Sequence, residues 1–436
     1  MRVAHCSIAV SSSLMTGFMS SSGIQEETQA QDVSREQTTS FLSQSSHPSV
    51  QYSQNPNYPS LSPCLYRCIA TLKGSSSYVS GFAVDGDTLY IASSDGHVRL
   101  WPLDMAMDVQ RAEQSSSTVA ITNTCIKCVV ATRNGLVSSH QDGKIRVWQT
   151  GRRSGSCHLA LRAVLPTAAD CLRTFLFPKN YVEVRRHRKR TWVHHVDAVT
   201  ALALSPDGVH MYSVSWDRSL KVWRLPGFRC VESVSPAHDD AINAVAVSAD
   251  GHVYTGSADK TIKAWRRHPG QRKLALVGTM GHHKAAVNAL AFGVGGQVLY
   301  SGSCDMTVIV WESAGGGMTA TSTLRGHTRA VLCLAAAGDV VCSGSSDRTV
   351  RVWRRGAAAV GYTCLAVLDG HTGAVKSLAV VGKMAGDHDS SCDECCSSRG
   401  CSAILVCSGS LDCDVKIWKV IVSCLRLGVL QLCADE

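Results

Sequence analysis

The feature that most constrains the fold of this chain is a short segment that recurs seven times, each time with an Asp six residues before a Trp. The copies read SSDGHVRLW, HQDGKIRVW, SWDRSLKVW, SADKTIKAW, SCDMTVIVW, SSDRTVRVW and SLDCDVKIW. Successive Trp residues are separated by 47, 75, 42, 46, 42 and 65 positions. Self-similarity at such a period indicates a repeat architecture, with insertions in the two long units.

Each copy ends a unit of short strands joined by turns. Between residues 198 and 223, three apolar or alternating runs are separated by the turn sequences PDG and WDR, and RCVESV follows as a fourth run. One four-stranded sheet cannot bury both faces, but seven sheets packed radially can. The sequence therefore predicts an all-β fold, a single seven-bladed propeller over residues 64–420 with insertions at about 149–194 and 383–402.

The two ends of the chain are expected to differ from this domain. Residues 1–63 are rich in Ser, Gln and Thr with six charged residues, which is typical of a disordered arm. Residues 65–74 resemble the outer strand before each later unit, so we expect them to complete the seventh blade. The segment 420–436, whose residues 421–436 form a C-terminal tail, is the rival for that place.

The repeat resembles the WD40-repeat family, in which a tetrad links a His before the first strand, a Ser or Thr on the second, the turn Asp and the Trp. The resemblance implies five complete sets: His195, Ser215, Asp217 and Trp223; His238, Ser257, Asp259 and Trp265; His283, Ser303, Asp305 and Trp311; His327, Ser345, Asp347 and Trp353; and His371, Ser410, Asp412 and Trp418. The first two units depart from it, because Ser75 and Thr122 stand where His is expected and His140 replaces the Ser. We expect weaker internal bonding in those two blades.

The recurring Asp, His and Ser residues do not indicate a hydrolase. Five copies at one register are expected of a scaffold, whereas an activated nucleophile needs a singular site in a cleft. The sequence contains no GxxxxGK[ST] phosphate loop, no HExxH, no GxSxG and no kinase motif set. We therefore expect a non-catalytic protein without a cofactor.

Function in a propeller is expected on the top face, where loops and strand ends surround the central channel. The resemblance implies partner-binding positions at Tyr78, Lys127, Gln141, Trp216, Asn243, Asn288, Arg329 and Lys376. Trp216 is the sharpest candidate, because it is not a repeat Trp and an exposed Trp is a frequent interface anchor. The alternative is that Trp216 only packs on the neighbouring blade. We expect a monomeric propeller that holds other proteins.

A basic segment precedes the third unit, with six cationic residues against Glu183: Lys179, Arg185, Arg186, Arg188, Lys189 and Arg190. It is consistent with a solvated strand, a nuclear-import signal, or a surface for nucleic acid or acidic lipid. Counting back from His195 places residues 186–192 on the outer strand of a blade, which favours the solvated strand. The net charge of +9 permits an acidic partner.

The insertion in the last unit gathers His388, Cys392, Cys395, Cys396 and Cys401. A C-x-x-C pair near a His has the chemistry of a zinc site, but only one half-site exists. A loop with incidental thiols and a metal or redox site both stay open. Twenty Cys in a chain without a convincing signal sequence favour reduced thiols in the cytoplasm or nucleus. No apolar run approaches the roughly 18–20 residues that span a bilayer.

The Ser-rich arm, the divergent first repeat and the insert VLPT…FPKNYVEVRRHRKRTWVHHVDAVTALA together resemble the plant WD-repeat proteins of the JINGUBANG type. That resemblance implies a regulatory plant protein of the cytoplasm or nucleus that holds partners such as transcription regulators. A substrate receptor of a ubiquitin ligase is an alternative. It is disfavoured because Arg or Glu, and not Asp, follows Trp223, Trp265, Trp311 and Trp353.

Overall fold

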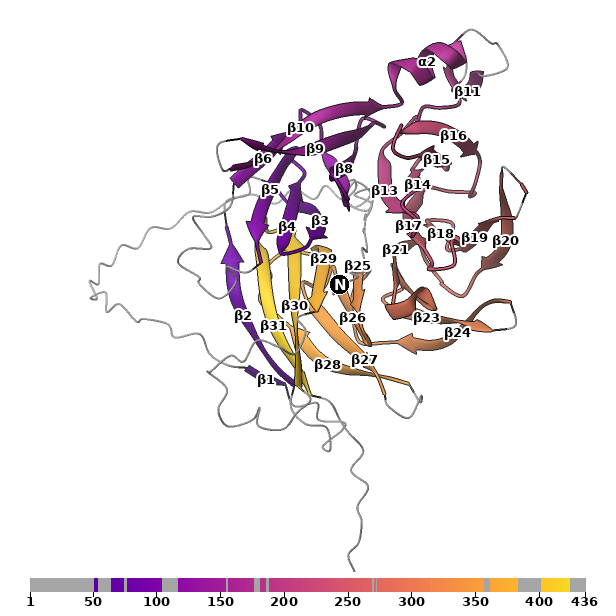
Figure 1. Cartoon of the computed structure of the whole chain (residues 1–436). Helices are drawn as coiled ribbons and strands as arrows, with labels where there is room; N and C mark the ends of the chain where they lie inside the picture. Colours follow the sequence, from indigo (N-terminus) through magenta and orange to yellow (C-terminus); the bar gives the residue numbers. More distant parts are fainter. Residues whose placement is uncertain are drawn as a thin grey trace, which may run out of the picture.

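The computed structural model describes residues 51–53, 64–73, 77–103, 117–153, 156–175, 181–185, 188–268, 270–271, 273–314, 316–356, 361–382 and 401–423. Seven antiparallel sheets stand around a common centre, as predicted (Figure 1). The innermost strands of successive sheets contact one another around the whole ring, including the last with the first. The fold is therefore a closed seven-bladed β-propeller.

In the first six blades the strands follow one another from the centre outward in chain order. Blade 1 has β3 (Val79–Asp85), β4 (Thr88–Ser93), β5 (His97–Pro102) and β6 (Ser117–Ile121). Blade 2 has β7 (Ile126–Thr132), β8 (Gly135–His140), β9 (Ile145–Arg153) and β10 (Ser156–Leu165). Blade 3 has β13 (Val199–Leu204), β14 (His210–Ser215), β15 (Leu220–Arg224) and β16 (Arg229–Val234).

The next three blades repeat this order. Blade 4 has β17 (Ile242–Val247), β18 (Val253–Ser257), β19 (Ile262–Arg267) and β20 (Leu274–Met280). Blade 5 has β21 (Val287–Phe292), the 3₁₀ turn η3 (Val294–Gly296), β22 (Val298–Ser303), β23 (Val308–Ala314) and β24 (Gly317–Leu324). Blade 6 has β25 (Val331–Ala337), β26 (Val340–Ser345), β27 (Val350–Arg355) and β28 (Tyr362–Leu368).

Blade 7 joins the two ends of the described chain. Its inner strands are β29 (Val375–Gly382), β30 (Cys401–Ser410) and β31 (Val415–Ser423), and its outer strand is β2 (Cys64–Leu72), against which β1 (Gln51–Ser53) pairs. Strand β2 runs antiparallel to β31, with Thr71 opposite Lys416. The early segment thus closes the ring, as its likeness to the outer strands predicted, and residues 420–423 of the rival belong to β31.

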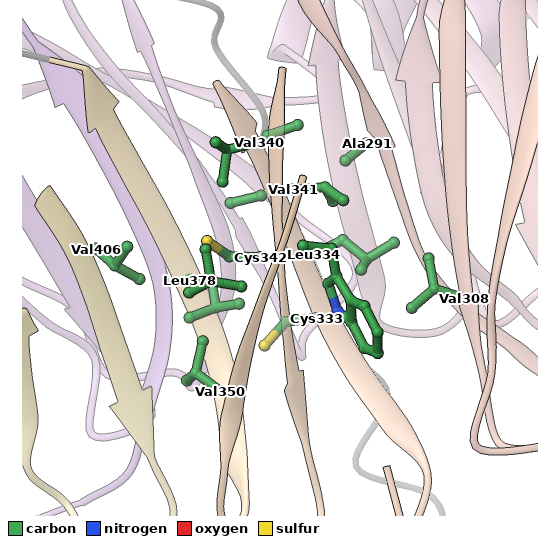
Figure 2. Close-up of a cluster of buried hydrophobic side chains, with 14 of the residues drawn as sticks. Ala291, Val308, Cys333, Leu334, Val340, Val341, Cys342, Val350, Leu378 and Val406 are labelled. Atoms are coloured by element: carbon green, nitrogen blue, oxygen red, sulfur yellow. The ribbon is translucent and has the colours of Figure 1, made fainter. Parts of the chain in front are cut away.

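The core lies between the blades. Figure 2 shows Cys333, Leu334 and Val350 of blade 6 among side chains of blades 5 and 7. The close approach depends on Gly residues of the second strands. A Cβ on Gly344, for example, would lie 2.7 Å from Val375 Cγ1 of the next blade. Each blade therefore buries its faces on its two neighbours.

The insertion between blades 2 and 3 corrects one prediction. The outer strand of blade 2 is β10, which pairs with β9 along its whole length. The basic segment lies instead in a separate two-stranded hairpin of β11 (Tyr181–Arg185) and β12 (Arg188–Thr191). With the helix α2 (Ala168–Phe175), it stands at the rim of the ring (Figure 1). The prediction of a blade outer strand over residues 186–192 was wrong, because ten residues of β10 already occupy that position.

Among the basic residues, Arg185 lies on β11, and Arg188, Lys189 and Arg190 lie on β12, while Lys179 and Arg186 lie outside the described residues. No helix in the described ranges is long and apolar enough to cross a membrane.

Candidate functional site: the top face and its lysine corner

Five blades hold their Trp through one chain of side-chain hydrogen bonds. In blade 4, His238 Nδ1 lies 2.8 Å from Asp259 Oδ2, and His238 Nε2 lies 2.7 Å from Thr255 Oγ1. The indole Nε1 of Trp265 donates to the same Thr255 oxygen at 2.9 Å. The same chain recurs through the hydroxyls of Ser213, Ser301, Ser343 and Ser408 in blades 3, 5, 6 and 7.

The predicted Ser of each tetrad was therefore wrong. The residues Ser215, Ser257, Ser303, Ser345 and Ser410 lie two positions later, where they cap the Asp turn. The Ser215 hydroxyl donates to Asp197 O at 3.1 Å and accepts from the Asp217 backbone N–H at 3.1 Å. Residues two apart on a strand share one face, so spacing alone does not distinguish the two Ser residues.

The pKa values of these buried His and Asp groups are both lowered, but for different reasons. Burial lowers the pKa of His195, against the charge of Asp217, and likewise lowers the pKa of His238. Burial alone raises the pKa of the Asp217 carboxyl, but His195, Ser219 and a backbone N–H hold it well below its usual range. Each hydroxyl is already bonded to both His and Trp. The arrangement stabilises a blade and leaves no free nucleophile in these tetrads.

Blade 2 rebuilds this chain from a different His. His140 Nε2 lies 2.8 Å from Ser138 Oγ, and Trp148 Nε1 donates to Ser138 Oγ at 2.8 Å. The other nitrogen, His140 Nδ1, lies 3.1 Å from Thr124 Oγ1. Burial, with the charge of Arg146, lowers the pKa of His140 to about 3. The expectation of weak bonding around this Trp was wrong, because Ser138 supplies the hydroxyl and His140, at the position of the turn-capping Ser, takes the role of the missing His.

In blade 1 the described residues do not form this chain around Trp101. The indole Nε1 of Trp101 is buried without a hydrogen-bond partner in the described part of the protein. The Asp95 backbone N–H is bonded to Ser77 Oγ at 2.8 Å, while Ser75 lies outside the described residues. Among the described residues, Trp101 is therefore not held by the chain of hydrogen bonds seen in the other blades.

The centre of the top face is built from seven equivalent positions, one at the bulge near the start of each inner strand. They are Ser80, Lys127, Thr200, Asn243, Asn288, Leu332 and Lys376. Asn243 Nδ2 donates to Val287 O at 3.0 Å, and Asn288 Nδ2 donates to Val331 O at 2.9 Å. These two amides are only 2% and 0% exposed. They link neighbouring blades, and binding of a partner at Asn243 and Asn288 stays a prediction.

Two lysines and two aromatic rings from four blades gather on the same face. We call Tyr78, Cys125, Lys127, Trp216 and Lys376 the lysine corner. Lys376 Nζ lies 4.3 Å from the centroid of the Tyr78 ring, and Lys127 Nζ lies 5.2 Å from that of Trp216. The Tyr78 hydroxyl lies 3.8 Å from Cys125 Sγ. Lys127 and Lys376 are 5% and 7% exposed. The two ammonium groups are therefore held against aromatic rings in the interior of the propeller.

Burial, together with the charge of Lys127, lowers the pKa of Lys376 to about 8. Burial also lowers the pKa of Lys127, against the charges of Cys125 and Asp197. The Tyr78 phenol stays neutral, because burial and Cys125 raise its pKa. Within the described ranges, Lys376 forms no ion pair with a carboxylate.

Other predicted anchors lie in the turns of the same face. Trp216 is half-buried, its backbone N–H donates to Ala198 O at 3.2 Å, and its Nε1 is buried without a partner in the described residues. Gln141 and Arg329 are exposed. Binding of a partner at these residues stays a prediction.

Cys125 was not predicted from the sequence as a residue of this face. Its signal is that five blades have Ala at this position, whereas blades 1 and 2 have Tyr78 and Cys125.

The candidate metal ligands lie mainly outside the described residues, which include none of His388, Cys392, Cys395 and Cys396; Cys401 is the first residue of β30. The described segments contain no group of three or more His, Cys, Asp or Glu that could hold a metal ion.

A family model for the WD domain, G-beta repeat, matches residues 66–102, 186–224, 228–266, 274–312, 318–354 and 362–419. The chain belongs to the WD40-repeat family. No matched segment covers blade 2, the WD40 blade in which His140 takes the role of the usual His.

Curated relatives share this WD40 repeat at low identity. Nuclear distribution protein PAC1-2 of Uncinocarpus reesii is 29% identical over 216 residues, which is 46% of this chain and 40% of that protein. Actin-interacting protein 1-2 of Arabidopsis thaliana is 27% identical over 262 residues, 56% of this chain and 38% of that protein. Ribosome biogenesis protein YTM1 of Phaeosphaeria nodorum is 24% identical over 180 residues, 41% of this chain and 38% of that protein. The chain spans less than half the length of these relatives.

Proposed function

We propose that this WD40 protein is a non-catalytic scaffold that holds partner proteins on its top face, around Trp216 and the lysine corner. WD40 propellers generally bind other proteins. The half-buried indole of Trp216, in a turn where the other blades carry Ser, Gln, Ala, Cys or Leu, is the observation that carries the proposal. Aromatic side chains at the centre of a surface are frequent binding hot spots.

We further place the protein among plant regulators of growth, development or signalling, in the cytoplasm or nucleus, with transcription regulators among its partners. The combination of Ser-rich arm, divergent first repeat and insert supports this assignment, and one relative, Actin-interacting protein 1-2, is from the plant Arabidopsis thaliana. A second candidate function is binding of nucleic acid or an acidic surface. It is favoured by the hairpin β11–β12, which stands outside the blade sheets and carries the sequence RKRT.

Affinity purification with mass spectrometry from plant cells separates the two functions. The wild type is compared with Trp216→Ala, with a variant in which Arg185, Arg186, Arg188, Lys189 and Arg190 are all Gln, and with Leu276→Ala. Leu276 is a control because it is 50% exposed on an outer strand. Loss of a discrete set of proteins with Trp216→Ala alone supports the scaffold. If partners survive that change and the Gln variant instead loses RNA or import factors, the hairpin is the working surface.

A further inference from the structure

The lysine corner concentrates positive charge at one side of the channel mouth. Of the seven equivalent inner-strand positions, only Lys127 and Lys376 carry a charge. They lie on β7 and β29, the inner strands that flank β3 of blade 1. Lys127 is close enough for its charge to disfavour the charged form of Lys376. The ring therefore holds two mutually repelling ammonium groups in one place.

Two lysines elsewhere in the protein, Lys221 and Lys263, donate to oxygen acceptors. Lys221, which is 2% exposed, donates to Trp192 O at 2.5 Å and to Ser233 Oγ at 2.8 Å. Lys263 donates to Ala237 O at 2.9 Å. Lys376 instead lies against the ring of Tyr78, which is a favourable contact, and no oxygen in the described part of the chain accepts from its three N–H donors. Burying an ammonium group without an anionic or strong oxygen partner costs free energy, so an anion bound at this point would stabilise the charged form of Lys376.

The neighbouring groups are donors as well. The Tyr78 phenol stays protonated, and the Trp216 Nε1 has no acceptor in the described part of the chain. The exposed carboxylate of Asp197 stands nearby, but its Oδ1 accepts from the Ala198 backbone N–H at 2.7 Å. Two ammonium groups held in a mostly buried place favour an anionic acceptor. A nucleic acid presents phosphates along a strand and requires a longer basic track than one lysine pair.

We propose that the lysine corner binds one acidic side chain of a partner protein, a carboxylate or a phosphoryl group, between the ammonium groups of Lys127 and Lys376. This inference rests on the proposed scaffold function and specifies the chemistry of its partner. The ring of Trp216, 5.2 Å from Lys127 Nζ, helps to hold the Lys127 ammonium group in position.

The test uses the full chain and three peptide libraries that differ only in the fixed central residue, which is Glu, phosphoserine or Ser. Peptides retained by immobilised protein are sequenced, and the Kd of the best ones is measured by fluorescence anisotropy. Lys127→Met with Lys376→Met keeps the aliphatic stems and removes both charges. Lys273→Met is the matched control, because Lys273 is exposed beside the β19–β20 connection, at the end of blade 4 away from the Asp turns.

We expect enrichment from the acidic libraries, an affinity at least about 10-fold lower in the double Met variant, and no change with Lys273→Met. The Glu and phosphoserine arms identify which acid is preferred. Retention of peptides without preference for an acid, or a preference that survives the double change, overturns the lysine corner and leaves the scaffold intact. If no library is retained and Trp216→Ala also loses no cellular partner, the scaffold function fails together with it.

Discussion

The ammonium nitrogen of Lys376 lies 4.3 Å from the centre of the Tyr78 ring, and this contact joins blade 7 to blade 1 where the propeller closes. The contact has two effects. It fixes the orientation of a buried charge on the top face, and it adds a side-chain link beside blade 1, in which Trp101 lacks a hydrogen bond in the described residues. Both effects can be measured.

Binding of an acidic peptide should weaken between pH 7 and pH 9. The pKa of Lys376 is about 8, so its charge is present below that pH and is lost as the pH rises through it. The groups around it are Lys127, whose pKa is also lowered, and Cys125 and Tyr78. Kd measured against pH checks this. Lys376→Arg keeps its charge throughout and should flatten the profile, while a profile unchanged by that substitution contradicts the assignment.

The corrected tetrad predicts unequal effects of two neighbouring Ser residues. Ser343→Ala removes the acceptor of Trp353 and the partner of His327, so it should lower the free energy of unfolding by about 2–3 kcal/mol. Ser345→Ala removes a turn cap and should cost about 1 kcal/mol. Urea unfolding of both variants at equal protein concentration provides the comparison. Equal losses would favour the Ser assignment made from the sequence.

Replacing the repeat Trp by Phe should distinguish blade 1 from blade 5. Trp311 Nε1 donates to Ser301 Oγ at 2.8 Å. Trp311→Phe removes this donor from the buried Ser301 hydroxyl, so it should lower the free energy of unfolding by about 1 kcal/mol more than Trp101→Phe does. In Trp101→Phe the lost N–H had no partner among the described residues. Thermal and urea unfolding report the difference. A larger loss at Trp101 would show that its indole N–H is bonded after all.

Stability and partner binding should be separable on the top face. Asn288→Ala leaves Val331 O without its donor and should cost about 1–3 kcal/mol of folding free energy while folded protein keeps its partners. Trp216→Ala should do the reverse, with about 2–4 kcal/mol lost from binding and little from folding. Urea unfolding and co-purification on the same preparations compare the two. The scheme fails if Asn288→Ala abolishes binding by stable protein.

Acid should destabilise the propeller in two steps. His195, His238 and His371 have lowered pKa values in the fold, so below about pH 6.5 the unfolded chain gains protons that the folded one does not, and stability falls. Asp217, Asp305 and Asp347 also have lowered pKa values, and their contribution is lost below about pH 4. Urea midpoints from pH 8 to pH 3 should fall throughout. A midpoint that rises on acidification contradicts this sign.

The ring could be predicted from the sequence because the Asp–Trp register recurs seven times and the Trp of each copy lies on the third strand of a blade. The closing strand could be predicted as well, because β2 has the apolar pattern of the other outer strands. The hydroxyl that completes each tetrad could not be predicted, because Ser343 and Ser345 lie two residues apart on one strand and so share the same face of the sheet. The hairpin of residues 181–191 was misplaced because its distance from His195 fits an outer strand, and only the pairing of β9 with β10 excludes that position.

The lysine corner was visible only in part. Equivalent repeat positions predicted that Tyr78, Lys127, Trp216 and Lys376 belong to one face. Their mutual contacts could not be predicted, because the four residues come from four blades and meet only through the curvature of the ring. The equivalent positions also gave no sign that the amides of Asn243 and Asn288 donate to a backbone carbonyl of the next blade.

The pairing of β2 with β31 also sets the order in which the protein can be completed. Lys416 Nζ donates to Thr71 Oγ1 across 345 positions of sequence. Strand β2 leaves the ribosome early and has its partner only when residues 415–423 have been made, because synthesis proceeds from the N-terminus. Until then β2 is an unpaired edge open to strands of other chains. Blade 7 is the last to be assembled, and an interruption of synthesis before residue 415 yields an aggregation-prone open ring.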